Sequence, residues 1–168
     1  MNSTQSPLRQ DGLSAPERAN LLEQSAWSFS FERKDLLDLA EFLKGYSASK
    51  GDVICNEGDG ESFMAIIIRG RLAVFKSAPD GTQPLVGHLG ADKSFGEMSV
   101  VDRDPLSAKV IADTDVRLLV MSRQEFDRLL DTQPRLACKF LTRIARLLSQ
   151  RLRQTTGQLA EHLAERLA

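Results

Sequence analysis

Cysteine and histidine are scarce in this sequence. Its 168 residues include only two cysteines, Cys55 and Cys138, and two histidines, His88 and His162. The cysteines lack Cys-x-x-Cys spacing, and the histidines have no partner ligand at metal-binding spacing. The sequence therefore predicts no metal site and no disulfide framework, and it favours a reducing, cytoplasmic setting.

Charge bias, long apolar runs and catalytic motifs are also absent. The net charge of −1 gives no overall attraction to nucleic acids or membranes. No apolar run approaches the length of a membrane-spanning helix, and the first residues lack the basic and apolar regions of a signal peptide. No Walker or Rossmann glycine loop and no recognisable pair of nucleophile and base occurs. These absences predict a protein that is not an enzyme and does not insert into a membrane.

The order of the sequence patterns predicts one domain with helical extensions, which suits 168 residues with 42% hydrophobic content. The start is polar, and leucines at helical spacing then predict helices that begin near Pro16 and end at Gly45. Short runs separated by Gly, Asp and Pro indicate strands. The predicted segments are a flexible N-terminal arm (1–14), N-terminal helices (15–45), a β-barrel (46–122) and C-terminal helices (123–168).

The central segment has the pattern of a jelly-roll β-barrel. Residues 63–68 carry apolar side chains at every position, which predicts a strand that is buried on both faces. Asp80-Gly81 is typical of a hairpin tip, and Val116, Leu118 and Val120 alternate as a last strand. We therefore predict a mainly β fold with flanking helices.

Two helices are predicted after the barrel. Ser122 and Glu125 have the spacing of a capping box, which starts a helix through reciprocal side-chain to backbone hydrogen bonds. Pro134 begins a second, longer helix. Its seam residues recur every three or four positions, as in a coiled coil: Leu141, Ile144, Leu148, Leu152, Thr155, Leu159 and Leu163.

The most informative segment is residues 95–108, here called the cassette. Gly96 and Glu97 stand at the start of a short apolar run, which predicts a turn entering a short helix whose free backbone N–H groups face a ligand. Pro105 stiffens the exit, and residues 107–112 have the small and β-branched side chains of a strand. The cassette is therefore predicted to leave and rejoin a sheet around an anion.

The cassette resembles the phosphate-binding cassette of cyclic-nucleotide-binding domains in the catabolite-activator (Crp/Fnr-like) family. The family pattern is Phe-Gly-Glu, a short helix, then Pro-Arg-Ser/Thr-Ala, and the resemblance extends over residues 31–156. It implies a regulatory, signal-transducing jelly-roll domain in which Gly96 and Glu97 hold a ribose 2′-hydroxyl and Ser107 helps to hold a cyclic phosphate. The implied ligand-binding residues are Gly96, Glu97, Met98, Ser99, Leu106, Ser107, Ala108, Thr155 and Thr156.

The long C-terminal helix is similar to the family's dimer helix. The resemblance implies a homodimer through residues 134–167, with Thr155 or Thr156 capping the base of a bound nucleotide. An alternative interpretation is that Thr155 and Thr156 are polar seam positions that set the register of the helix pair.

Leu106 occupies the position of the family's phosphate-binding arginine. Loss of one partner from a buried, hydrogen-bonded charge pair typically costs about 2–5 kcal/mol, or roughly 30-fold to several thousandfold in affinity. We therefore expect weak cAMP binding or an altered specificity, with cGMP or a cyclic dinucleotide as further candidate ligands. Backbone amides after Glu97, the Ser107 hydroxyl, and a cation from Arg103 or Lys109 are candidate replacements for the arginine.

Two alternative functions stay open at this point. In the first, Leu106 fills the pocket, and the chain is a ligand-free dimeric scaffold that binds a protein partner. In the second, the chain is the sensor half of a transcription regulator. It would be only half because no segment of this sequence resembles the helix-turn-helix of the family's transcription factors. Residues 134–156 carry six cations and no acid, but without a base-reading element we interpret them as a solvated face and predict no binding to nucleic acid.

Overall fold

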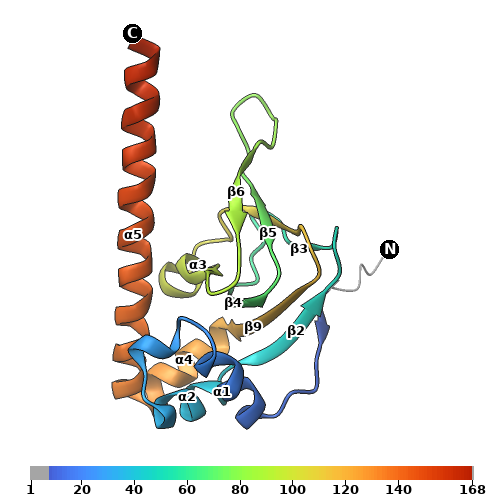
Figure 1. Ribbon diagram of the computed structural model, residues 1–168, viewed down its shortest axis with the longest axis vertical. Helices are drawn as coiled ribbons and strands as arrows, with labels where there is room; N and C mark the ends of the chain where they lie inside the picture. Colours follow the sequence, from blue (N-terminus) through green and yellow to red (C-terminus); the bar gives the residue numbers. More distant parts are fainter. Residues whose placement is uncertain (1–7, 168) are drawn as a thin grey trace.

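Two antiparallel sheets form the barrel of the computed structural model, which describes residues 8–167 (Figure 1). The larger sheet has the strand order β1-β2-β9-β4-β7, and the smaller sheet has the order β3-β8-β5-β6. The strands are β1 (Arg9–Gln10), β2 (Lys44–Ala48), β3 (Val53–Cys55), β4 (Phe63–Arg69), β5 (Leu72–Phe75), β6 (Leu85–Leu89), β7 (Ser94–Phe95), β8 (Lys109–Ala112) and β9 (Val116–Ser122). The helical segments are α1 (Ala15–Glu23), η1 (Ser28–Ser30), α2 (Arg33–Ala40), α3 (Glu97–Asp102), α4 (Arg123–Thr132) and α5 (Pro134–Leu167). The predicted mainly β fold with flanking helices is confirmed.

Strand β4 lies between β9 and β7 and separates two hydrophobic clusters. Its Met64 and Ile66 side chains belong to a cluster that includes residues of the flanking helices, such as Phe140 on α5. Ala65 and Ile67 belong to the second cluster, which includes residues of the smaller sheet. Because successive strand residues point to opposite faces, β4 contributes to both clusters. This confirms the prediction of a strand that is buried on both faces.

The N-terminal segment differs from the sequence prediction at two points. Strand β1 lies within the predicted flexible arm and pairs with β2, while residues 1–7 of that arm lie outside the described residues. Helix α2 ends at Ala40, so the predicted helix end at Gly45 is wrong, and Gly45 lies inside β2. A Cβ atom at Gly45 would collide with the Asp11 carboxylate. The glycine therefore allows the close approach of two chain segments and does not stop a helix.

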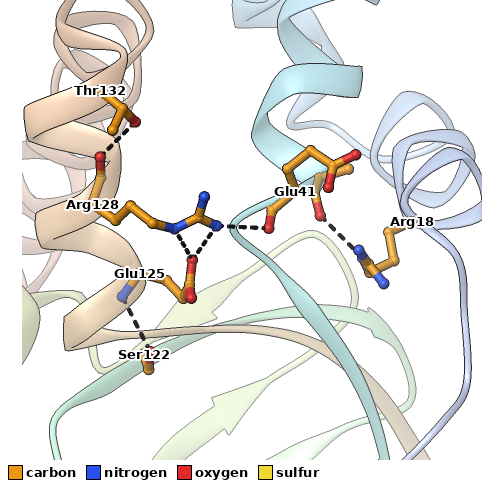
Figure 2. A network of polar contacts seen from close by, with 7 residues as sticks. Arg18, Glu41, Ser122, Glu125, Arg128 and Thr132 are labelled. Atoms are coloured by element: carbon orange, nitrogen blue, oxygen red, sulfur yellow. Dashed lines mark hydrogen bonds and ion pairs between the residues drawn. The ribbon is translucent and has the colours of Figure 1, made fainter.

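Arg128 on α4 connects the C-terminal helices to the turn between α2 and β2 (Figure 2). Its guanidinium donates to the Glu41 carbonyl at 3.1 Å, pairs with the Glu125 carboxylate at 2.5 Å, and lies 4.2 Å from the centroid of the Phe42 ring. The Ser122 hydroxyl accepts the Glu125 backbone N–H at 3.2 Å, so this half of the predicted capping box is confirmed. The Glu125 carboxylate instead binds Arg128 on the same helix, and Arg128 makes the contact from α4 to the end of α2.

Helix α5 packs against the rest of the protein along its first half. Phe140 and Ile144 are buried, whereas every side chain from residue 152 to 165 is exposed. Figure 1 shows the second half extending past the barrel. Leu152, Leu159 and Leu163 lie on this exposed half. Within residues 8–167, no helix has the length and apolar character that crossing a membrane requires.

Candidate functional site

A cavity of about 470 Å³ lies where the cassette, the smaller sheet and α5 meet. In Figure 1, α3 of the cassette lies between the barrel and the middle of α5. Eight of the nine residues predicted for the site line this cavity: Gly96, Glu97, Met98, Ser99, Leu106, Ser107, Ala108 and Thr155. Thr156 is not part of the lining, and its hydroxyl donates to the Leu152 carbonyl at 2.8 Å.

Gly96 gives the cassette its close contact with the larger sheet. It caps the N-terminus of α3 with a φ of 76°, in the left-handed region that favours glycine. A Cβ atom at this position would collide with the Phe63 carbonyl oxygen and lie 3.3 Å from Met64 Cα. Glycine therefore permits both the left-handed backbone and the close approach to β4. It also places Glu97 at the first position of α3.

Glu97 is buried in the wall of the cavity, with a residue exposure of 1%. Its Oε1 atom accepts a hydrogen bond from Nη1 of Arg151, and Nη2 of the same guanidinium donates to the Ser94 carbonyl. Its second oxygen, Oε2, has no hydrogen-bond partner among the protein atoms. The carboxylate thus joins the cassette to α5 across 54 residues of sequence and keeps one acceptor unused.

Leu106 forms part of the cavity wall and does not fill the cavity. It is 4% exposed and packs in the cluster that includes Cys55, Phe95 and Val110. Its backbone N–H donates to the Asp59 carbonyl at 3.0 Å, and its carbonyl accepts from the Gly58 N–H at 2.8 Å. These bonds hold the cassette exit in place, and the side chain brings neither charge nor hydrogen-bond donor.

The cations proposed from the sequence as replacements lie outside the cavity lining. Arg103 is exposed at the C-terminal end of α3, and Lys109 stands on β8 opposite Phe75. The lining cations that the structure adds are Lys93, in the turn before β7, and Arg151. Neither was assigned to the site from its position in the sequence.

Lys76 lies close to the cassette exit without lining the cavity. Its Nζ atom donates to the Ser107 carbonyl at 2.6 Å and pairs with the Glu57 carboxylate. Hydrogen bonds from Lys76 and from the Ser77 backbone hold the pKa of Glu57 at about 2, well below its usual value. The Lys76 charge is therefore already matched by a carboxylate.

Helix α5 supplies one wall of the cavity, and most of that wall was missed by sequence reasoning. Besides Thr155, the wall contains Leu147, Gln150, Arg151, Gln154 and Gln158. The glutamines recur every four residues, as do Arg151 and Thr155, so all of them share one helix face. This four-residue spacing could have indicated a polar face on the helix. The interpretation followed the leucine pattern of the same helix instead.

Cys55 lines the cavity from β3, and its thiol is unreactive at neutral pH. Burial raises the pKa of its thiol to about 12, and Sγ lies 3.8 Å from the Ala108 carbonyl. At neutral pH the group is therefore an uncharged, weakly polar surface. Among residues 8–167, no group of three His, Cys, Asp or Glu side chains is arranged to hold a metal ion.

The comparison with known protein families agrees with this site. The sequence profile of the cyclic nucleotide-binding domain matches residues 47–133, about half of the chain, including the whole cassette. The chain belongs to the cyclic nucleotide-binding domain family. The Crp/Fnr-like resemblance drawn from Phe95-Gly96-Glu97 and from Pro105 to Ala108 is thereby confirmed.

Relatives of this cyclic nucleotide-binding domain occur in several kinds of regulated protein. The chain is 29% identical over 123 residues to a CRP-like cAMP-activated global transcriptional regulator of Mycobacterium tuberculosis, covering 73% of this chain and 53% of the relative. It is 35% identical over 102 residues to a cyclic nucleotide-gated potassium channel of Rhizobium etli, covering 61% of this chain and 27% of the channel. The chain thus spans about half, or less, of the length of these relatives.

A solved structure matches the domain over nearly all of its length. The crystal structure of a cyclic nucleotide-binding domain from Methylobacillus flagellatus has a TM-score of 0.81 and 25% sequence identity. The match covers 94% of this chain and 90% of that one. The jelly-roll barrel, the N-terminal helices and the long C-terminal helix are therefore shared.

Proposed function

We propose that this chain is a non-enzymatic regulatory domain that senses a ribose-bearing ligand of the cyclic-nucleotide type. The observation that carries the proposal is the open cavity beside Glu97, a buried carboxylate with one oxygen bound to Arg151 and the other unpaired. An unpaired buried acceptor is costly, and a ligand hydroxyl would satisfy it. The family match and the cAMP-activated relative support cyclic nucleotides as the first candidate ligands to test.

The proposed signal is a change in how α5 is held. Arg151 on α5 donates hydrogen bonds to Glu97 and to the Ser94 carbonyl, and so connects the helix to the cassette. A ligand that donates a hydroxyl to Glu97 and contacts Thr155 binds to the cassette and to the helix together. Because a ligand shifts an equilibrium only through its differential affinity, the response requires that α5 be held differently when the cavity is full.

Leu106 is proposed to weaken or change the ligand preference. Neither Arg103 nor Lys109 lines the cavity, so the lost arginine is not replaced from those positions. We expect cAMP to bind roughly 30-fold to several thousandfold more weakly than to a pocket with the arginine. cGMP and cyclic dinucleotides are the other candidate charged ligands.

Isothermal titration calorimetry with a ligand panel tests the sensing function. The panel contains cAMP, cGMP, a cyclic dinucleotide and the parent nucleosides as uncharged members. We expect at least one to bind, and we expect Glu97→Gln to weaken that binding by roughly 10-fold or more, since a charge-assisted hydrogen bond contributes about 1.5–3 kcal/mol. If no member of the panel binds at millimolar concentration, the proposed sensing function is refuted.

A dimer through residues 134–167 is the second part of the proposal. Leu152, Leu159 and Leu163 are 69%, 56% and 49% exposed along the second half of α5. A second copy of the helix would cover them in the manner of a coiled coil. If no ligand binds, these leucines favour the alternative of a dimeric scaffold that acts on a protein partner, or of the sensor half of a transcription regulator. A cytoplasmic location completes the proposal.

A further inference from the structure

The floor of the cavity at the cassette exit is made of apolar groups. Cys55, Val110 and Val74 lie at the same level on three neighbouring strands, because Val110 on β8 is paired with Cys55 on β3 and with Val74 on β5. Leu106 adjoins them in the same hydrophobic cluster as Cys55 and Val110. The high pKa of the Cys55 thiol, which burial raises to about 12, keeps this group uncharged.

The two lysine and arginine side chains that line the cavity, Lys93 and Arg151, do not come from the three strands of this floor. Lys76 binds the Ser107 carbonyl, does not line the cavity, and is paired with Glu57. Arg151 on α5 binds Glu97, and Lys93 immediately precedes β7 of the larger sheet, whereas β3, β8 and β5 belong to the smaller sheet. The lining cations therefore come from α5 and from the segment that leads into Glu97, not from the strands of the floor.

His88 lines the cavity from β6, and its partner is also an acid. Its Nε2 atom lies 3.7 Å from the Asp113 carboxylate. An anion at the cavity floor would thus lose its hydration without gaining a matched charge, which is unfavourable.

The opposite end of the cavity offers a hydrogen-bond acceptor that a ligand donor can satisfy. Glu97 is almost fully buried, and its Oε2 atom has no partner. A ribose hydroxyl can donate to this oxygen, and doing so adds no charge to the floor. Along α5, the amides of Gln150, Gln154 and Gln158 offer both donors and acceptors to the edge of a base.

We infer that the pocket selects an uncharged nucleoside over the corresponding 3′,5′-cyclic phosphate. The inference rests on the proposed function, because it names the ligand class of the same cavity. Removing the phosphate removes the anion that the floor cannot match, and it leaves neutral hydroxyls that the Ser107 side chain can hydrogen-bond. The ribose contact with Glu97 is unchanged by this substitution of ligand.

Calorimetry of the full chain with matched ligands tests the preference without any mutation. The probes are adenosine with cAMP, guanosine with cGMP, and 2′-deoxyadenosine. We expect at least one nucleoside to bind roughly 10-fold or more tightly than its cyclic phosphate, since the phosphate anion must be desolvated without a matched cation. We expect 2′-deoxyadenosine to bind roughly 10-fold more weakly than adenosine if adenosine is the ligand, because Oε2 then loses its donor.

The Leu106→Arg variant supplies the reverse test, with Leu106→Met as the control that keeps an apolar side chain of similar size. The arginine should invert the preference in favour of the cyclic phosphate, and the methionine should leave the order unchanged. Unfolding curves of both variants confirm that each is folded before binding is compared. Cyclic phosphates that bind the unchanged chain as tightly as their nucleosides would overturn the inference and leave the sensor intact. Failure of every probe to bind would overturn both.

Discussion

The ion pair between Arg151 and Glu97 predicts an unequal response to the loss of either partner. Glu97 is the buried partner, with its side chain 2% exposed, whereas the Arg151 side chain is 35% exposed. Arg151→Met therefore leaves a carboxylate without its counter-ion inside the protein. Glu97→Gln leaves a guanidinium that can turn toward water. The first change should cost much more stability than the second.

The magnitude follows from this difference in exposure. Breaking a fully buried pair costs about 3–5 kcal/mol, and the partial exposure of Arg151 reduces this to about 2–3 kcal/mol for Arg151→Met. Glu97→Gln should cost about 1 kcal/mol or less, because a neutral amide can keep one hydrogen bond. The double variant should cost about 1–2 kcal/mol less than the sum of the two, since the stranded charge is removed.

Urea denaturation followed by tryptophan fluorescence measures these free energies of unfolding. Trp27 is the single tryptophan of the chain and is fully buried, so its emission reports loss of the core. Arg153→Met is the matched control, because Arg153 lies two residues along the same helix, is exposed, and donates a hydrogen bond to the Ser149 hydroxyl of its own helix at 3.2 Å. If Arg151→Met costs no more than Arg153→Met, or less than Glu97→Gln, the assignment of the buried charge is refuted.

Three further outcomes are expected. Gly96→Ala should lower the free energy of unfolding by at least about 2 kcal/mol, because it combines a left-handed backbone with a collision at the Phe63 carbonyl; an unchanged urea midpoint would contradict this. A disulfide reagent at pH 8 should titrate one thiol per folded chain, at the exposed Cys138, and two after unfolding, because burial raises the pKa of Cys55 to about 12 and keeps it protonated; two fast thiols in the folded protein would count against the buried site. Leu159→Arg should convert a dimer into a monomer in light scattering, and a monomeric parent chain would disprove the helix pairing.

Much of the site could be predicted because its signals are local in the sequence. The glycine and the acid at the start of the cassette, and the proline at its exit, follow from turn and helix-start chemistry within a few residues. The same is true of Leu106, whose lack of charge is a property of the residue type. These features do not depend on how distant segments meet, and eight of the nine predicted residues line the cavity.

The contact of Arg151 with Glu97 was beyond sequence reasoning because the two residues are 54 positions apart. The local sequence around Glu97 and around Arg151 does not indicate which cation of α5 contacts the cassette. The choice between Thr155 and Thr156 has the same origin, since neighbouring helix residues point about 100° apart. Which one faces the cavity depends on how α5 is rotated when it docks.

The sequence by itself determined the barrel, the long helix and the leucine at the position of the cassette arginine, because periodicity, turn residues and side-chain chemistry are properties of short segments. Only the tertiary structure decided which α5 side chains enter the cavity, that Leu106 forms a wall around open space, and that Gly45 accommodates Asp11. Those outcomes depend on the distance and rotation between elements, and these are set by packing of the whole core.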